Sequence, residues 1–135
     1  MRVKLGQIVA SQGSLAKLLG GATADGQVVP APNVSAQMGW HLHLLRKVVI
    51  EQIQYFEAER EKIAHEVDPQ KPETLIEADK RLEELLSVEV VLAAVGRIKL
   101  SVLEKESILL SANDFSALEW LIKPDLPSIF EAEEE

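Results

Sequence analysis

The chain has 135 residues, of which 47% are hydrophobic, and it carries a net charge of −8 with no cysteine. This length is enough for one hydrophobic core and too short for two, and the lack of cysteine excludes disulfides, thiolate metal sites and cysteine nucleophiles. No stretch approaches the roughly 18 consecutive apolar residues of a membrane span. We therefore expect a single-domain cytoplasmic protein that does not enter a membrane.

The N-terminal segment predicts a short strand over residues 2–5 and a helix that continues to residue 19, because its apolar residues recur at helical spacing. Gly20-Gly21 ends this helix. Residues 20–33 are rich in small residues and proline, which indicates a flexible loop with a possible hairpin across Thr23 to Val28.

The strongest pattern is a helix from about Asn33 to Val67, in which apolar residues recur every three or four positions. Asn33 or Ser35 can cap its first turn, and Asp68-Pro69 ends it. At about 1.5 Å per residue the helix runs on the order of 50 Å, which exceeds the width of a compact domain of this mass. Part of it must therefore project or pack against another chain, and we expect a homo-oligomer. The residues expected at its interface are Met38, Leu42, Leu45, Val49, Ile53 and Phe56.

Pro72 suits a first helical position and opens a second helix that ends near Ser87. The connector is short, so the two helices should form an antiparallel hairpin. Residues 88–92 and 97–100 then read as two short strands. The second strand repeats the Arg-x-Lys-Leu pattern of residues 2–5, so we expect both segments to lie in the same small sheet.

Two capping patterns mark the C-terminal part, namely Ser101 with Glu104 and Ser111 with Asp114. They predict a short helix over 102–106 and a firmer one over 112–122. The chain as a whole is thus expected to be mainly α with a small β element, consisting of a long helical hairpin, a two- or three-stranded sheet and a C-terminal helix. One domain should cover residues 1–122.

Residues 123–135 form an acidic segment that Pro124 and Pro127 keep out of regular structure, and we expect this tail to be disordered. It carries three large apolar residues, Leu126, Ile129 and Phe130. These side chains either act as a docking segment for a partner or fold back onto the core.

Charge is unevenly distributed along the chain. Residues 1–50 contain five basic residues and one acidic residue, a net charge of +4, whereas residues 51–135 contain nine basic and 21 acidic residues, a net charge of −12. The simple explanation is an acidic surface that aids solubility; the alternative is attraction between opposite ends of neighbouring copies. Basic residues are too few and scattered to favour nucleic-acid binding.

No residue pattern points to catalysis. His41 and His43 are two positions apart, about 200° around a helix axis, so they cannot hold one metal ion from one helix face. Nothing resembles a strained serine elbow, a P-loop or a dinucleotide fingerprint. We therefore expect a protein that is not an enzyme and has no cofactor or metal.

A compact cationic and aromatic cluster lies near the start of the long helix. It consists of Trp40, His41, Arg46 and Lys47, together with His43. These side chains could bind an anionic ligand or an acidic partner segment. Alternatively, Trp40 packs against the first helix and the cations line a solvated rim.

A basic, leucine-rich start and a long charged helix are followed by three characteristic segments. These segments are Leu85-Leu86-Ser87-Val88-Glu89-Val90-Val91, Ile98-Lys99-Leu100-Ser101-x-Leu103-Glu104, and Leu110-Ser111-x-x-Asp114-x-x-x-Leu118-x-x-Leu121-Ile122. This order of elements resembles that of small, uncharacterised proteins of tailed bacteriophages and prophages. It implies a virion-assembly accessory or a host-interaction factor, located in the host cytoplasm or on the virion, whose partners are itself and a phage or host protein. The alternative is an anti-defence or inhibitory factor that sequesters a small anionic ligand or blocks a host protein.

Overall fold

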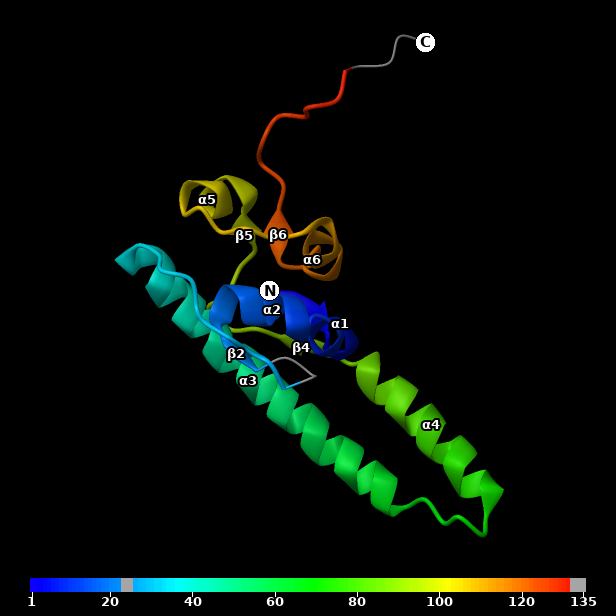
Figure 1. The fold of residues 1–135 in the computed structure, drawn as a ribbon. Helices are drawn as coiled ribbons and strands as arrows, with labels where there is room; N and C mark the ends of the chain where they lie inside the picture. The colour runs from blue at the N-terminus through cyan, green and yellow to red at the C-terminus, as the bar shows by residue number, and fades with distance from the viewer. Residues whose placement is uncertain (23–25, 132–135) are drawn as a thin grey trace.

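The computed structural model describes residues 1–22 and 26–131, and its secondary structure is mainly helical (Figure 1). The elements in chain order are β1 (Arg2–Lys4), α1 (Leu5–Ala10), α2 (Gln12–Leu19), β2 (Gly21–Ala22), β3 (Val28–Val29), α3 (Ala36–His65), α4 (Pro72–Leu86), β4 (Glu89–Val91), β5 (Ile98–Lys99), α5 (Leu100–Lys105), α6 (Ala112–Ala117) and β6 (Ile122–Lys123). The predicted fold class, mainly α with a small β element, is confirmed.

The long helix α3 forms where the apolar period predicts it, with ends drawn in by two or three residues. Ser35 is the cap, since its Oγ accepts a hydrogen bond from the backbone N–H of Met38 at 3.2 Å. This bond satisfies one of the amide donors that the first helical turn leaves free.

The predicted helix over residues 5–19 is instead two helices, α1 and α2, separated at Ser11. The Ser11 side chain is buried and its Oγ donates to the backbone carbonyls of Gln7 and Ile8, at 2.7 and 3.1 Å. Such back-bonding of serine to the preceding turn competes with regular helix geometry. The Trp120 indole Nε1–H also donates to Ser11 Oγ at 3.3 Å, so the break is tied to the C-terminal part of the chain.

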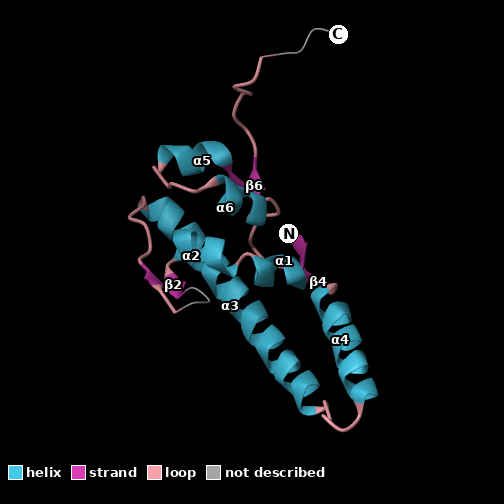
Figure 2. Cartoon of the chain, turned by 45° about the vertical axis from the view of Figure 1, so that its right-hand side comes forward, coloured by secondary structure: helices cyan, strands magenta, loops and turns pink. Residues whose placement is uncertain are grey.

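Helices α3 and α4 form the predicted antiparallel hairpin, which extends away from the rest of the molecule (Figure 2). We call residues 53–86 the hairpin, and the remaining described residues up to Lys123 the body. The hairpin encloses its own apolar cluster with α1, and that cluster consists of Leu5, Phe56, Ile63, Ala78 and Leu85. Helix α1 approaches α4 closely, because a Cβ added at Gly6 would lie 2.9 Å from the carbonyl oxygen of Leu86.

The expectation that residues 2–5 and 97–100 share one sheet is wrong. Strand β1 pairs antiparallel with β4, with Val3 opposite Val90, whereas β5 pairs in parallel with β6, with Ile98 opposite Ile122. The Arg-x-Lys-Leu similarity reflects two separate strand-to-helix transitions, since α1 and α5 each begin directly after the strand. The predicted loop hairpin does form, as β2 with β3, although residues 23–25 of it lie outside the described residues.

The capping prediction holds for Ser111 and fails for Ser101. Ser111 Oγ accepts from the N–H of Asp114 at 3.2 Å, and the Asp114 carboxylate accepts from the N–H of Ser111 at 2.9 Å. Helix α6 is only half as long as predicted, because the chain turns at Leu118 and enters β6. Ser101 lies inside α5, whose cap position is Lys99, and its backbone N–H donates to Asp125 at 2.8 Å.

The body surrounds the main hydrophobic core, to which the N-terminal half of α3 contributes one wall. Leucine side chains from distant segments meet there without solvent exposure, among them Leu18, Leu45, Leu103 and Leu118. Both ends of the described chain thus contribute to the same core.

Candidate functional site

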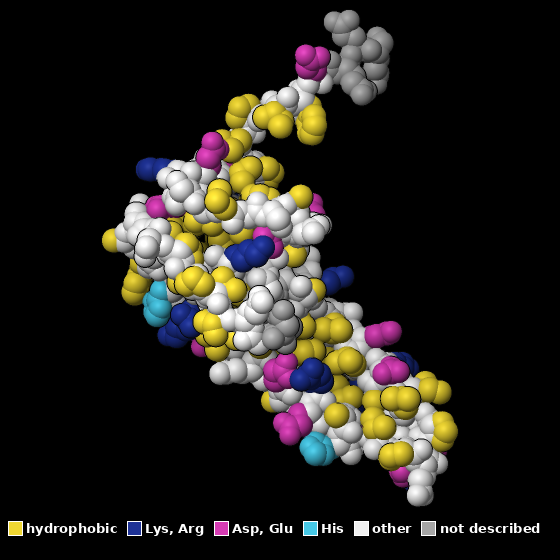
Figure 3. All heavy atoms as spheres, viewed as in Figure 1, with side chains coloured by type: hydrophobic (Ala, Val, Ile, Leu, Met, Phe, Trp, Pro, Cys, Tyr) yellow, Lys and Arg dark blue, Asp and Glu magenta, His cyan; other side chains and the backbone are white. Residues whose placement is uncertain are grey.

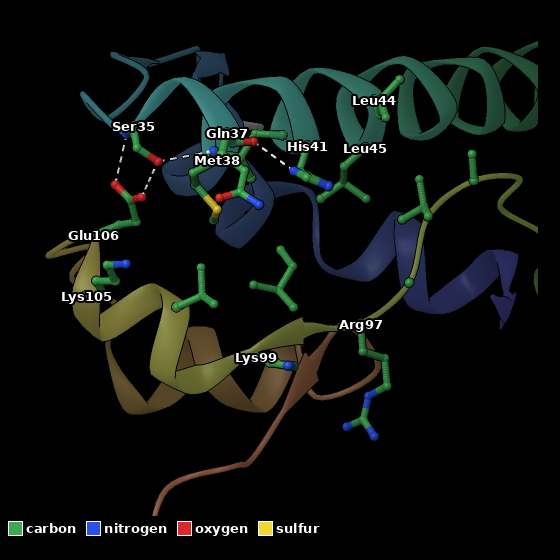
Figure 4. A pocket seen from close by; sticks show the side chains of 16 residues that line it. Ser35, Gln37, Met38, His41, Leu44, Leu45, Arg97, Lys99, Lys105 and Glu106 are labelled. Atoms are coloured by element: carbon green, nitrogen blue, oxygen red, sulfur yellow. Dashed lines mark hydrogen bonds between the residues drawn. The ribbon is translucent and has the colours of Figure 1, made fainter.

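An open pocket of about 590 Å³ lies between the first three turns of α3 and the segment from Ala94 to Glu106 (Figure 4). This volume falls within the range of pockets that accept small molecules or a few side chains of a peptide. Its apolar lining comes from the core-facing side of α3 and from the neighbourhood of β5 and α5. These residues are Met38, Leu42, Leu44, Leu45, Val95, Ile98 and Val102.

Basic side chains border this apolar lining. Lys99 at the end of β5 and Lys105 in the last turn of α5 are both exposed. Neither forms an ion pair within residues 1–22 and 26–131. Each lies near a carboxylate that its charge affects, since Lys105 helps to lower the pKa of Glu106 and Lys99 helps to lower that of Asp125. Both ammonium groups remain exposed beside the apolar surface.

Arg97 lines the pocket but serves a structural role. Its guanidinium donates to the backbone carbonyl of Glu119 at 3.3 Å and to that of Ile122, and in Figure 4 the side chain extends away from the pocket centre. Because these bonds join β5 to the start of β6, Arg97 fixes the strand pair that forms this wall.

Ser35 and Glu106 close one end of the pocket. The backbone N–H of Ser35 donates to Glu106 Oε2 at 2.9 Å, and its hydroxyl donates to the other carboxylate oxygen. These hydrogen bonds to the charged form hold the pKa of Glu106 below its usual value. The same serine caps α3, so the joint sets the position of α3 relative to α5.

His41 faces the pocket from α3 (Figure 4). Its Nδ1 lies 2.7 Å from the backbone carbonyl oxygen of Gln37. A carbonyl oxygen can only accept, so Nδ1 carries the proton and Nε2 of the neutral ring remains an acceptor.

The four residues predicted to bind a ligand do not form one site. Of Trp40, His41, Arg46 and Lys47, His41 alone lines the pocket. Trp40 is 60% exposed, and its ring lies beside that of His43, with centroids 5.5 Å apart. Consecutive residues of a helix differ by about 100° around its axis. Side chains that are close in the sequence, such as these four, therefore lie on different faces of α3.

The predicted interface residues also need correction. Met38, Leu42, Leu45, Val49 and Phe56 are buried within their own chain, and Ile53 is half-buried against the main core. The helix does project, as its length required, but the main core covers its apolar stripe from Met38 to Val49, and α1 and α4 cover Phe56 and Ile63. This stripe therefore forms no broad interface between folded copies, and a second copy can reach it only where Met38, Leu42 and Leu45 line the pocket.

The three apolar residues of the tail are exposed, so in this structure they do not fold back on the core. Ile129 is 94% exposed, Phe130 is 85% exposed and Leu126 is 41% exposed. Figure 3 shows hydrophobic side chains along this segment, clear of the body.

Sequence reasoning missed the basic border of the pocket. Val102 and Lys105 share one face of α5, and Lys99 and Glu106 flank this helix at the same spacing of three or four residues. This pattern could have marked the four residues as a group. Nothing in the sequence indicated that this face would lie opposite His41 and Gln37 of α3.

Among the described residues, no group of three or more His, Asp or Glu side chains is arranged to hold a metal ion. Nor does any helix in the described part of the chain combine the length and apolar character needed to cross a membrane. Comparison with known protein families, curated protein sequences and solved structures gives no match.

Proposed function

We propose that the protein is a non-enzymatic protein–protein interaction factor of the kind that tailed bacteriophages encode. In this proposal, the pocket between α3 and α5 receives an apolar and acidic segment of the partner. The observation that carries it is the combination of an apolar lining with two exposed lysines at the border, Lys99 and Lys105, neither of which is in an ion pair among the described residues.

The chemistry of the pocket supports a ligand with both characters. The free energy falls when an apolar group of a ligand covers side chains such as Val102 and Ile98 and removes them from water. Lys99 and Lys105 favour a negative charge at the edge, where they stay solvated and mainly increase the association rate and the specificity. A peptide segment that alternates apolar and acidic residues meets both requirements at once.

The resemblance to phage proteins supports the class of function. The segments that carry it fold into β4, into β5 with α5, and into α6 with β6, and the second of these provides the pocket border. A virion-assembly accessory or a host-interaction protein would act by such binding and needs no catalytic group.

Native mass spectrometry of the protein, purified gently from its producing cells, tests this function. We expect retained protein, either a second copy or a phage or host chain, and we expect Lys99→Glu with Lys105→Glu to lose it. Lys47→Glu with Lys71→Glu makes the same charge change at two exposed lysines outside the pocket. Partner binding that is equal in both double variants would contradict the assignment to this pocket.

A second candidate function is sequestration of a small anionic ligand, with inhibition of a host protein as its outcome. The volume of about 590 Å³ and the cationic border favour it as well. In the same spectra it predicts a retained small mass that disappears in the Lys99→Glu, Lys105→Glu variant.

A further inference from the structure

We propose that the pocket between α3 and α5 binds the C-terminal segment of a second copy of this chain, residues 125–135. This inference rests on the proposed function and names the partner of its site. It joins the two most unusual surfaces of the molecule, an apolar pocket with basic edges and an exposed apolar segment with acidic residues.

The C-terminal segment has the composition that the pocket requires. Ile129 and Phe130 are adjacent and almost fully exposed, which costs free energy as long as nothing covers them. Glu131 follows directly, and Glu133, Glu134 and Glu135 complete the sequence with no basic residue after Lys123. Apolar anchors are thus followed at once by a run of negative charge.

The order of apolar and acidic residues in the C-terminal segment also matches the arrangement of the apolar lining and the basic border of the pocket. If Phe130 and Ile129 enter the apolar lining near Val102, the glutamates that follow lie at the border, beside the exposed Lys99 and Lys105. Aromatic anchors in apolar pockets commonly supply most of the affinity, and the surrounding charges supply register.

The geometry points to a second copy and not to the same chain. Asp125 accepts hydrogen bonds from the N–H and the hydroxyl of Ser101, which hold the start of the segment against the first turn of α5. From there the chain leads away from the body (Figure 1), and in Figure 4 it leaves β6 on the side of β5 and α5 opposite to α3. A tail that leaves its own pocket in this way is presented to a neighbour.

Such a contact is heterologous, because the tail of one copy meets the pocket of the next. Contacts of this type close into rings or continue as open chains. The charges at the contact itself are opposite in sign, since the acidic C-terminal residues of one copy meet Lys99 and Lys105 of another.

The proposal can be tested by sedimentation velocity on full-length chains. We expect the wild type to self-associate with increasing concentration. Ile129→Ser with Phe130→Ser, the tail variant, and Lys99→Glu with Lys105→Glu, the pocket variant, should each weaken self-association at least about tenfold. Leu109→Ser removes an apolar side chain that is 90% exposed elsewhere, so it should leave the assembly unchanged.

Mixing the two variants gives the sharpest result. Neither should associate alone, but the intact tail of the pocket variant can enter the intact pocket of the tail variant. We therefore expect a species of one copy of each, with no larger assembly, and weaker association as salt rises. A mixture that stays monomeric, or variants that associate as the wild type does, would overturn the proposal.

A wild type that remains monomeric at every concentration would also overturn it. A synthetic peptide of residues 125–135 that then binds the tail variant better than the wild type would assign the pocket to the chain's own tail. The proposed function would survive this failure if native mass spectra of the wild type still showed another protein partner that the pocket variant loses.

Discussion

Side-chain hydrogen bonds in the body join segments that lie far apart in the sequence, whereas those of the hairpin are mostly local. In the body, the Asp114 carboxylate accepts from Ser14 Oγ at 2.8 Å and from Lys17 Nζ at 2.6 Å, across separations of 100 and 97 residues. In the α3 arm of the hairpin, the ion pairs join residues three or four positions apart, such as Lys62 with Glu59.

This difference shows which part of the molecule needs distant segments of the chain in order to fold. The hairpin can form from residues close in the sequence, because its connector is short and its ion pairs either lie within one helix or, as Arg81 with Glu66, join its two arms. The body forms only when the two ends of the chain meet, which costs loop-closure entropy that the core and the long-range bonds must offset. Four predictions test this contrast, from the largest expected effect to the smallest.

Loss of a body leucine should destabilise the protein most. Leu118 is fully buried where α6 ends, in contact with the main core, so Leu118→Ala is expected to lower the free energy of unfolding by about 2–5 kcal/mol. Urea denaturation measures this loss. Leu85→Ala, at a slightly exposed position of the hairpin cluster, is the matched variant, and a larger loss there would reverse the contrast.

Removal of the Asp114 carboxylate should have the next largest effect. Asp114→Ala leaves Ser14, Lys17 and the N–H of Ser111 without their acceptor, and so removes one of the two reciprocal bonds at the start of α6. We expect a loss of about 2 kcal/mol in the free energy of unfolding. Ser14→Ala removes one of these bonds and should cost less; equal losses would show that the network does not centre on Asp114.

Acid should weaken the body through the same residue. Burial raises the pKa of Asp114, but the hydrogen bonds from Lys17, Ser111 and Ser14 outweigh it and hold the pKa well below its usual value. The unfolded chain then binds a proton more readily than the folded one. This stabilisation is fully present above about pH 5 and is lost progressively as pH falls below about 4. Thermal melting against pH measures it, and Asp114→Asn should flatten that part of the profile.

The smallest effect is expected at the surface of the hairpin. Lys62→Ala breaks an exposed pair with Glu59, with nitrogen and oxygen 3.2 Å apart, and should change the free energy of unfolding by less than about 0.5 kcal/mol. The same denaturation experiment measures it. A loss above 1 kcal/mol would mean that this local pair supports more than its own helix turn.

The candidate site was less predictable than the fold. His41 belongs to the pocket, as the sequence suggested, but its predicted companions Trp40, Arg46 and Lys47 point elsewhere. Lys99 and Lys105 join it from a segment more than fifty residues away in the sequence. Composition and spacing within one helix cannot reveal such a neighbour, because its position depends on how α5 packs against α3.

The sequence by itself determined the elements whose signals are local. The apolar period and Ser35 define α3, Pro72 opens α4, and the reciprocal bonds of Ser111 and Asp114 open α6. These features follow from helix geometry and from the need to satisfy backbone amides within a turn or two.

Only the tertiary structure decided which surfaces remain free. The partners of β1 and β5, the burial of Leu45 and Val49 within their own chain, and the pocket bordered by Lys99 and Lys105 all depend on contacts between distant segments. An apolar stripe on a helix indicates that this face of the helix is buried, but it does not indicate which element covers it. The physical reason is that the hydrophobic effect is non-directional, so the packing of the whole chain determines which surface covers the stripe.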